Sequence, residues 1–229
     1  MFPEGRPVLC LITDRRRLFQ TIGSKAQDAE RLLLDQITGA ISGGVDVVQI
    51  RERDLDGRAV ASLTRRCLAL AKGSATQVVV NDRLDVAIAT GAAGVHLRED
   101  SFSIDAARRV YGGDQLVGRS IHSPSAARAM RHASYLIAGS IFPTSSKRDA
   151  IGLGLDGLRE VVRSSGECPV WAVGGITAAR LPLLVRAGAR GMAAIGAFIP
   201  TPPVHDLVGA VQKLVTELRF SFDSSAGLS

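Results

Sequence analysis

Three polar side chains lie at alternate positions where an apolar stretch of the chain ends: Gln49, Arg51 and Arg53. A spacing of two places all three on one side as long as the chain remains extended. Two guanidinium groups beside an amide suit a diphosphate, because arginine binds phosphate oxygens through paired N–H donors. The plainer interpretation is a pair of surface arginines neutralised by Glu52 and Asp54.

Carboxylates, hydroxyls, a histidine and a lysine follow four other apolar stretches. In chain order they are Asn81 and Asp82; Glu99 and Asp100; Ser120 and His122; and Thr144, Ser145, Ser146 and Lys147. One or two carboxylates among cations and hydroxyls are what a diphosphate needs when it binds with a divalent cation. Each group also has an ordinary structural explanation. The first suits a helix cap, since Asn and Asp accept from free N–H groups, and the others suit a solvated surface.

Two glycine turns follow the apolar runs at residues 171–173 and 192–195. The first turn contains Gly174 and Gly175, and the second contains Gly196. Glycine lets backbone N–H groups approach a ligand closely, and a helix that follows adds partial positive charge at its start. Side by side, the two turns predict a phosphate cradle, although glycines serve tight strand-to-helix turns equally well.

Eight short apolar stretches, each followed by a helical pattern, carry these side chains. We expect strands at residues 7–12, 45–50, 77–80, 94–97, 116–119, 135–138, 171–173 and 192–195. After the first strand we expect a loop made of Thr13, Asp14 and the three arginines at residues 15–17. The alternation predicts an α/β protein with a parallel sheet, and eight repeats predict a single (β/α)8 TIM barrel. An open, doubly wound sheet is the alternative, but no GxGxxG motif follows the first strand. In a barrel the carboxyl ends of all strands meet at one face, so the polar residues above would converge there.

The composition fits one domain with a full core. We expect the barrel to occupy residues 1–221 and residues 222–229 to form a disordered tail. Hydrophobic residues make up 46% of the chain, which argues against general disorder. The net charge of +6 fits either solvated arginines or an anionic small-molecule substrate. Nucleic acid is disfavoured as a partner, because aromatic residues are only 4% of the chain.

The cysteines and the apolar runs indicate in which cellular compartment the protein is expected. Cys10, Cys67 and Cys168 are far apart and have neither metal-site nor disulfide spacing. The first residues lack the pattern of a signal peptide, and no apolar run reaches the roughly 18 residues of a membrane span. These features predict a cytoplasmic protein that does not enter a membrane.

The order of the polar motifs resembles the thiamine phosphate synthase family, from the first strand to the last. The motifs are Gln49-x-Arg51-x-Arg53, Asn81-Asp82, Ser120-x-His122, Pro143-Thr144-x-Ser146-Lys147 and Gly174-Gly175-Ile176. The segment IFPTSSKRDA, residues 141–150, is the most specific of them. The resemblance implies a transferase of thiamine biosynthesis that couples hydroxymethylpyrimidine diphosphate to thiazole phosphate and releases diphosphate. It also implies a requirement for Mg2+ and a homodimer.

The resemblance implies a role for each matching residue. Those expected to hold the pyrimidine diphosphate are Gln49, Arg51, Arg53, Asn81, Ser120 and Lys147. Those expected to hold the thiazole phosphate are Thr144, Ser146, Gly174, Gly175, Ile195 and Gly196. Asp82 and Asp100 are expected to bind Mg2+. Arg51, Arg53 and Lys147 are expected to act in catalysis by neutralising the departing diphosphate.

Four features depart from the family's pattern. Arg53 stands where the family usually has lysine, Ser146 where it has threonine, and Gly196 where it has serine. The stretch from His96 to Asp100 is one residue shorter than usual. Asp100 therefore matches the family's second magnesium ligand only if a gap of one residue is placed in this stretch.

Without that gap, the stretch resembles the related thiazole tautomerases, which isomerise a thiazole carboxylate phosphate. In this alternative His122 is the catalytic residue that moves the proton. A third alternative is a barrel that binds a phosphorylated ligand without turnover and serves as a regulatory partner. The retained Arg51, Arg53 and Lys147 favour the synthase, because a tautomerase has less need of a diphosphate clamp.

Overall fold

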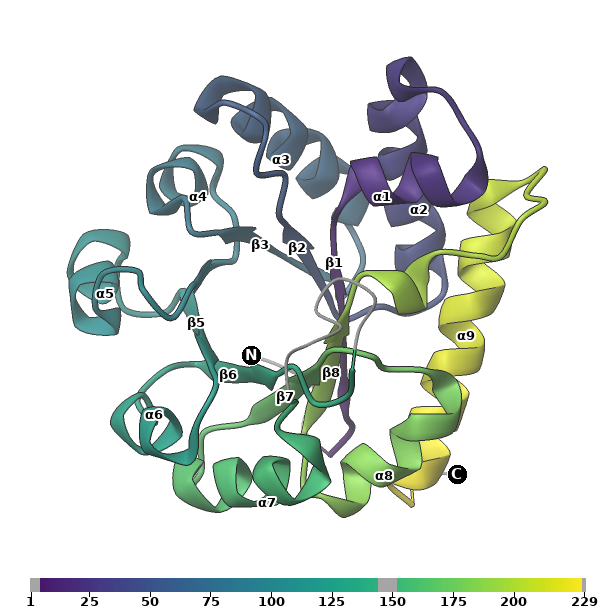
Figure 1. Cartoon of the computed structure of the whole chain (residues 1–229). Helices are drawn as coiled ribbons and strands as arrows, with labels where there is room; N and C mark the ends of the chain where they lie inside the picture. Colours follow the sequence, from purple (N-terminus) through teal and green to yellow (C-terminus); the bar gives the residue numbers. More distant parts are fainter. Residues whose placement is uncertain (1–4, 144–151, 228–229) are drawn as a thin grey trace.

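The computed structural model of the chain describes residues 5–143 and 152–227. Eight parallel strands close into a barrel in chain order, with β8 paired to β1, and helices surround them (Figure 1). The strands are β1 (Val8–Ile12), β2 (Val47–Ile50), β3 (Gln77–Asn81), β4 (Gly94–Leu97), β5 (Leu116–Ile121), β6 (Tyr135–Gly139), β7 (Val170–Val173) and β8 (Gly191–Ala194). The predicted (β/α)8 TIM barrel is therefore confirmed, and the open sheet is excluded.

Helices follow the strands along the chain. They are α1 (Arg15–Ile22), α2 (Ala29–Ser42), α3 (Gly57–Ala71), α4 (Leu84–Thr90), α5 (Ile104–Tyr111), α6 (Pro124–Ala129), α7 (Gly154–Ser165), α8 (Leu181–Arg186) and α9 (Leu207–Ser225), with the short 3-10 turns η1 (Ala26–Asp28), η2 (Ala178–Arg180) and η3 (Gly196–Phe198). Asp14, Asp56, Ser103, Ser123 and Asp206 each cap a helix by accepting a hydrogen bond from a backbone N–H in its first turn.

Among the described residues, no helix has both the length and the apolar character needed to cross a membrane.

Apolar side chains fill the interior of the barrel. They are Val8, Cys10, Ile12, Val47, Val79, Tyr135, Ile137, Trp171 and Ala193. Tyr135 and Trp171 stack with their ring centroids 3.9 Å apart, and Gly118 leaves room for the phenol ring, which a Cβ there would overlap. Both aromatic residues lie near the starts of their strands. They therefore fill the lower part of the barrel and leave its carboxyl end to polar side chains.

The structure differs from two sequence predictions that bear on the site. The sequence predicts a loop at residues 15–17, whereas these three arginines form the first turn of α1. The reason is Asp14, whose side chain accepts from the Arg17 N–H and so begins the helix directly after β1. In addition, β5 continues to Ile121 and pairs with β6 through Ser120, which places Ser120 on the strand rather than in the following loop.

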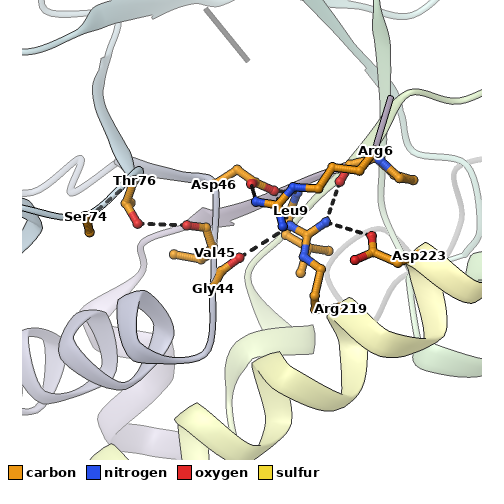
Figure 2. Close-up of polar contacts among 10 residues, drawn as sticks. Arg6, Leu9, Gly44, Val45, Asp46, Ser74, Thr76, Arg219 and Asp223 are labelled. Carbon is orange, nitrogen blue, oxygen red and sulfur yellow. Dashed lines mark hydrogen bonds and ion pairs between the residues drawn. The ribbon is translucent and has the colours of Figure 1, made fainter. Parts of the chain in front are cut away.

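The closing helix α9 is longer than predicted. It runs to Ser225, so the prediction of a disordered tail is wrong for residues 222–225. Phe222 is fully buried against the barrel, and Asp223 accepts a hydrogen bond from Arg219 at 3.1 Å (Figure 2). The burial of Phe222 and the ion pair between Arg219 and Asp223 both stabilise this last part of the helix. The helix therefore extends beyond the expected boundary.

Candidate active site

The carboxyl ends of β2 to β5 bring four polar side chains together inside the mouth of the barrel. Gln49 on β2 is buried and donates through Nε2 to Oδ1 of Asn81 on β3, at 3.0 Å. Next to them, Nε2 of His96 on β4 lies 2.8 Å from Oγ of Ser120 on β5. All four side chains line one cavity of about 800 Å³, which we call the arginine cavity because Arg51 also borders it.

Two of the residues that line this cavity each have a buried polar atom that is unsatisfied. Within residues 5–143 and 152–227, neither Oε1 of Gln49 nor Nδ1 of His96 has a hydrogen-bond partner. Burial, followed by the charges of Arg119 and Arg51, lowers the pKa of His96 to about 3, so the ring is neutral at neutral pH. An unsatisfied buried group costs about 1–3 kcal/mol, which a bound ligand can offset by supplying the partner. His96 was not among the predicted site residues, although the alternation of side chains along β4 could have indicated that it faces inward.

Arg51 lies between two cavities. Its backbone N–H donates to Oγ1 of Thr13 at 2.8 Å, which fixes the chain where β2 ends. Its side chain borders the arginine cavity together with Arg53, and it also borders a second cavity beside β7 and β8. Burial, and then the charge of Arg53, lowers the pKa of the Arg51 guanidinium. Among the described residues Arg51 has no salt-bridge partner, so an anionic ligand is the natural counter-ion for this buried charge.

Two carboxylates at the mouth share one arginine. Nη1 of Arg98 lies 3.7 Å from Oδ2 of Asp82, and its Nε donates to Oδ1 of Asp100 at 2.9 Å. The hydrogen bond from Arg98 lowers the pKa of Asp100. Asp82 adopts a positive φ of 62° and accepts a hydrogen bond from the Ser101 hydroxyl. The geometry thus brings together the two predicted metal-binding carboxylates, with a guanidinium beside both.

The donor chemistry of this pair fits magnesium. Mg2+ prefers carboxylate oxygens and is commonly held by one or two of them together with water and substrate phosphates. The described residues contain no group of three or more His, Cys, Asp or Glu side chains that could hold a metal by themselves. Asp82 and Asp100 therefore suit an ion that binds together with a phosphorylated ligand, after the half-exposed Arg98 side chain has moved aside.

Arg119 on β5 anchors the loop between β4 and α5. Its guanidinium donates to the carbonyl oxygens of Phe102, Glu99 and Ser101 at 2.6, 2.7 and 3.0 Å. The residue is only 4% exposed, so the loop that carries Asp100 is held from beneath by a buried charge. Sequence reasoning assigned no role to Arg119, because its loop partners are 17 to 20 residues away along the chain.

His122 is held from two sides. Its Nδ1 hydrogen-bonds the carbonyl oxygen of Gly139, which makes Nδ1 the protonated nitrogen. Its Nε2 lies 3.6 Å from Oε2 of Glu99 and faces the arginine cavity. The ring is therefore held in one orientation at the mouth of the barrel.

The second cavity, of about 750 Å³, lies where β7 and β8 end, and we call it the glycine cavity. Gly174 and Gly175 have φ angles of +100° and +62°, which L side chains rarely adopt. A Cβ on Gly174 would also lie 2.7 Å from Cβ of Ser140. Ile195 and Gly196 form the wall after β8. The four predicted cradle residues therefore line one cavity, with glycine required at the first turn.

Two arginines that the sequence did not indicate also line the glycine cavity: Arg17 and Arg180. Arg180 donates to the carbonyl oxygen of Gly175 and lies over the Phe142 ring, 4.4 Å from its centroid. Arg17 extends from α1 to Gly196. The turn η2 stands between the glycine turn and the six-residue helix α8, so side-chain cations rather than a long helix supply positive charge here. Only barrel closure brings residue 17 near residue 196, which is why sequence reasoning missed this arginine.

One predicted motif lies outside the described residues. It comprises Thr144, Ser145, Ser146 and Lys147. The other predicted site residues gather at the carboxyl end of the barrel. All of them except Asp82 line the two cavities that Arg51 separates, and Asp82 lines a smaller adjoining cavity with Arg51, Arg53 and Arg98.

Comparison with known proteins gives a consistent result. A family model described as thiamine monophosphate synthase matches residues 19–198. The thiamine-phosphate synthase of Roseiflexus castenholzii is 38% identical over 88% of this chain and 85% of the relative. That of Azorhizobium caulinodans is 34% identical over 92% of this chain and 96% of the relative. Among solved structures, thiamine phosphate pyrophosphorylase from Pyrococcus furiosus is 29% identical, with a TM-score of 0.77 over 95% of this chain and 96% of that one.

Proposed function

The chain belongs to the thiamine monophosphate synthase family, and from this premise we propose that it is a transferase that joins hydroxymethylpyrimidine diphosphate to thiazole phosphate and releases diphosphate. The observation that carries the proposal is the position of Arg51, whose side chain borders both cavities at the mouth. A reaction between two phosphorylated molecules requires two adjoining sites that hold the reacting atoms together.

The arginine cavity is the proposed site of the pyrimidine diphosphate. The unsatisfied Oε1 of Gln49 would accept a hydrogen bond from the pyrimidine, and Asn81 holds the Gln49 amide in the orientation this requires. Arg51 and Arg53 would bind the diphosphate, since both border this cavity and neither has a salt-bridge partner among the described residues. Ser120 would lie beside the pyrimidine and the diphosphate.

Mg2+ is the proposed cofactor, held by Asp82 and Asp100 together with the diphosphate. When bound, it would supply positive charge to the leaving group in addition to the arginines. Arg98 would then leave the two carboxylates, because the metal ion would take its place beside them.

The glycine cavity is the proposed site of the thiazole phosphate. Its phosphate would lie against Gly174, Gly175, Ile195 and Gly196. Thr144 and Ser146 would contact the thiazole and Lys147 the diphosphate, on the strength of the family resemblance.

The proposed reaction is dissociative. The bond between the pyrimidine methylene carbon and the diphosphate oxygen breaks first, and its electron pair leaves with the diphosphate. The thiazole nitrogen then donates its lone pair to the methylene carbon and forms the new C–N bond. No strong base is needed, so Arg51, Arg53 and Lys147 would contribute by neutralising charge and holding the partners.

The decisive experiment measures diphosphate release from hydroxymethylpyrimidine diphosphate with thiazole phosphate present, with and without Mg2+. We expect release of diphosphate and formation of thiamine phosphate only when Mg2+ is added. Arg51→Ala is expected to lower turnover strongly, since the residue faces both substrates.

The same assay distinguishes the alternatives. The oriented His122 favours the tautomerase as the second candidate, because its Nδ1 is fixed and its Nε2 faces the cavity. Isomerisation of thiazole carboxylate phosphate that is lost in His122→Ala, without coupling, would replace the synthase by the tautomerase. Binding of phosphorylated ligands without any turnover would instead indicate a regulatory barrel.

We also propose that the protein is a homodimer, on the family resemblance alone. A solution mass near twice the 24.1 kDa of one chain is expected in sedimentation equilibrium. A mass equal to that of a single chain would contradict this proposal and leave the proposed reaction unaffected.

A further inference from the structure

Three consecutive arginines begin α1, and their surroundings differ. Arg15 pairs with Glu52 and Asp54 at 2.9 and 2.6 Å, and Arg16 pairs with Asp54 at 2.9 Å. Arg17 has no carboxylate partner among the described residues, and it is the one of the three that lines the glycine cavity. Two of the charges are thus neutralised within the protein, and the third faces a cavity without a counter-ion.

The guanidinium of Arg17 occupies the space that a side chain at position 196 would need. A Cβ on Gly196 would come within 2.8 Å of Nη2 and 3.3 Å of Cζ of Arg17. Gly196 has no positive φ, so its backbone does not require glycine. A side chain at position 196 would therefore displace the tip of the arginine from its observed position.

The start of α1 fixes where Arg17 can reach. The Asp14 side chain accepts from the Arg17 backbone N–H at 3.0 Å, and the neighbouring Leu18 is fully buried. The Arg17 side chain itself is exposed and makes no hydrogen bond with the described residues. A cation held at its base and free at its tip is suited to binding a ligand rather than to supporting the fold.

The other arginine of the cavity is already engaged. Arg180 donates to the Gly175 carbonyl oxygen and lies against the Phe142 ring. It therefore shapes the glycine turn, whereas Arg17 retains its donors for an incoming anion.

We propose that Arg17 binds the phosphate group of the thiazole substrate, through the space that Gly196 leaves open. The identity of the ligand rests on the proposed function, whereas the anion site rests on the cavity and on the free charge. Arg17 then determines that the phosphorylated thiazole is preferred over the free alcohol. A charge-assisted hydrogen bond of this kind is expected to strengthen binding about tenfold or more.

The test is isothermal titration calorimetry with thiazole phosphate, the unphosphorylated thiazole alcohol and hydroxymethylpyrimidine diphosphate. Arg17→Ala is expected to weaken thiazole phosphate binding about tenfold or more and to leave the other two ligands unchanged. Arg16→Ala is the matched control, because Arg16 is the neighbouring exposed arginine and pairs with Asp54 instead. It is expected to bind all three ligands as the unaltered protein does. Unchanged affinity of Arg17→Ala for thiazole phosphate, or an equal loss for the alcohol, would overturn the inference.

A second pair of variants tests the place of the guanidinium. Gly196→Ala adds a Cβ that displaces the Arg17 tip, so it should weaken thiazole phosphate binding as Arg17→Ala does. Because Gly196 also lies against the proposed phosphate, the loss caused by Gly196→Ala should be smaller in the Arg17→Ala background than in the unaltered protein rather than absent. Equal losses in both backgrounds would mean that position 196 and Arg17 act separately, and would overturn the proposed arrangement.

Inorganic phosphate separates this inference from the proposed function. If the unaltered protein binds phosphate but not thiazole phosphate, and Arg17→Ala loses the phosphate, the anion site stands and the synthase proposal fails. If thiazole phosphate couples normally and Arg17→Ala binds it fully, the synthase proposal stands and the role of Arg17 fails. If the unaltered protein binds neither ligand, both fail.

Discussion

At the scale of single residues, His96 makes the protein sensitive to acid. Burial lowers its pKa to about 3 from the ordinary 6.5. Between these values the unfolded chain binds a proton that the folded chain does not, so the free energy of unfolding falls as the pH falls. The stability that depends on the neutral ring is fully present above about pH 6.5 and is lost progressively toward pH 3. In urea unfolding from pH 7 to pH 4, His96→Asn should therefore show a flatter pH dependence than the unaltered protein.

His205→Asn is the control for this prediction. His205 is exposed and lies outside both cavities. An equally steep decline in His96→Asn and in the unaltered protein would assign the acid sensitivity to other groups.

Arg98 offers a second prediction about a single residue. Its guanidinium lies beside both Asp82 and Asp100, the proposed magnesium ligands. Arg98→Ala removes the competing cation, so the Mg2+ concentration that gives half-maximal diphosphate release should fall several-fold. Arg159→Ala, which removes a surface pair with Asp156, serves as the control. An increased Mg2+ requirement in Arg98→Ala would show that the arginine helps to hold the metal complex instead of competing with it.

How far the sequence predicts a residue's position depends on where its partners lie. The positions of Gln49, Arg51 and Arg53 at the mouth could be predicted, because their alternation is local and strand ends converge in any barrel. Arg17 could not be assigned in this way, since its neighbour Gly196 lies across the closure between β1 and β8. The two residues are far apart in the sequence and belong to no common motif, so the sequence does not indicate that they meet.

At the scale of elements, the strands could be predicted from the residues within them. The loops could not, because their conformations depend on hydrogen bonds to side chains outside the loop. The stretch at 94–97 was predicted with its observed bounds, because apolar residues between glycine and charged residues delimit it. The first turn of α1 was missed, since its three arginines suggest a loop and only the Asp14 cap reveals the helix. The support of the β4–α5 loop by Arg119 is likewise invisible in the sequence, although it positions Asp100.

That loop provides a prediction at the same scale. Arg119→Ala removes the donor to the carbonyl oxygens of Glu99, Ser101 and Phe102 and should loosen the segment that carries Asp100. The Mg2+ concentration for half-maximal diphosphate release should rise several-fold, while the affinity for thiazole phosphate stays the same because the glycine cavity is elsewhere. Arg108→Ala, at the surface of α5, should alter neither quantity. A loss of thiazole phosphate affinity equal to the change in Mg2+ requirement would indicate general disruption of the barrel.

At the scale of the whole molecule, one cluster of charges joins the beginning and the end of the chain. Asp46, just before β2, is 4% exposed and accepts from the Leu9 N–H at 2.8 Å and from Arg6 at 2.6 Å (Figure 2). Arg219 of α9 pairs with the same carboxylate and donates to the Pro7 carbonyl oxygen at 2.6 Å. The closing helix is thus fastened to the start of β1 at the end of the barrel opposite the cavities.

Removing Arg219 should therefore destabilise the molecule without changing its chemistry. Arg219→Ala leaves the buried Asp46 carboxylate without its partner on α9, although Arg6 still pairs with it. Loss of a hydrogen bond to a charged group in this way costs about 1.5–3 kcal/mol. Arg31→Ala is the matched control, because Arg31 is 62% exposed and pairs with Asp28 and Asp35 on the surface. That variant should lose no more than about 0.5 kcal/mol. Urea unfolding measures both values, and the affinities for the two substrates at 25 °C should remain unchanged in each variant. The contrary result would be weaker thiazole phosphate binding in Arg219→Ala with an unchanged free energy of unfolding. It would show that the charge cluster affects the cavities at the other end of the barrel, and would contradict a purely structural role for Arg219.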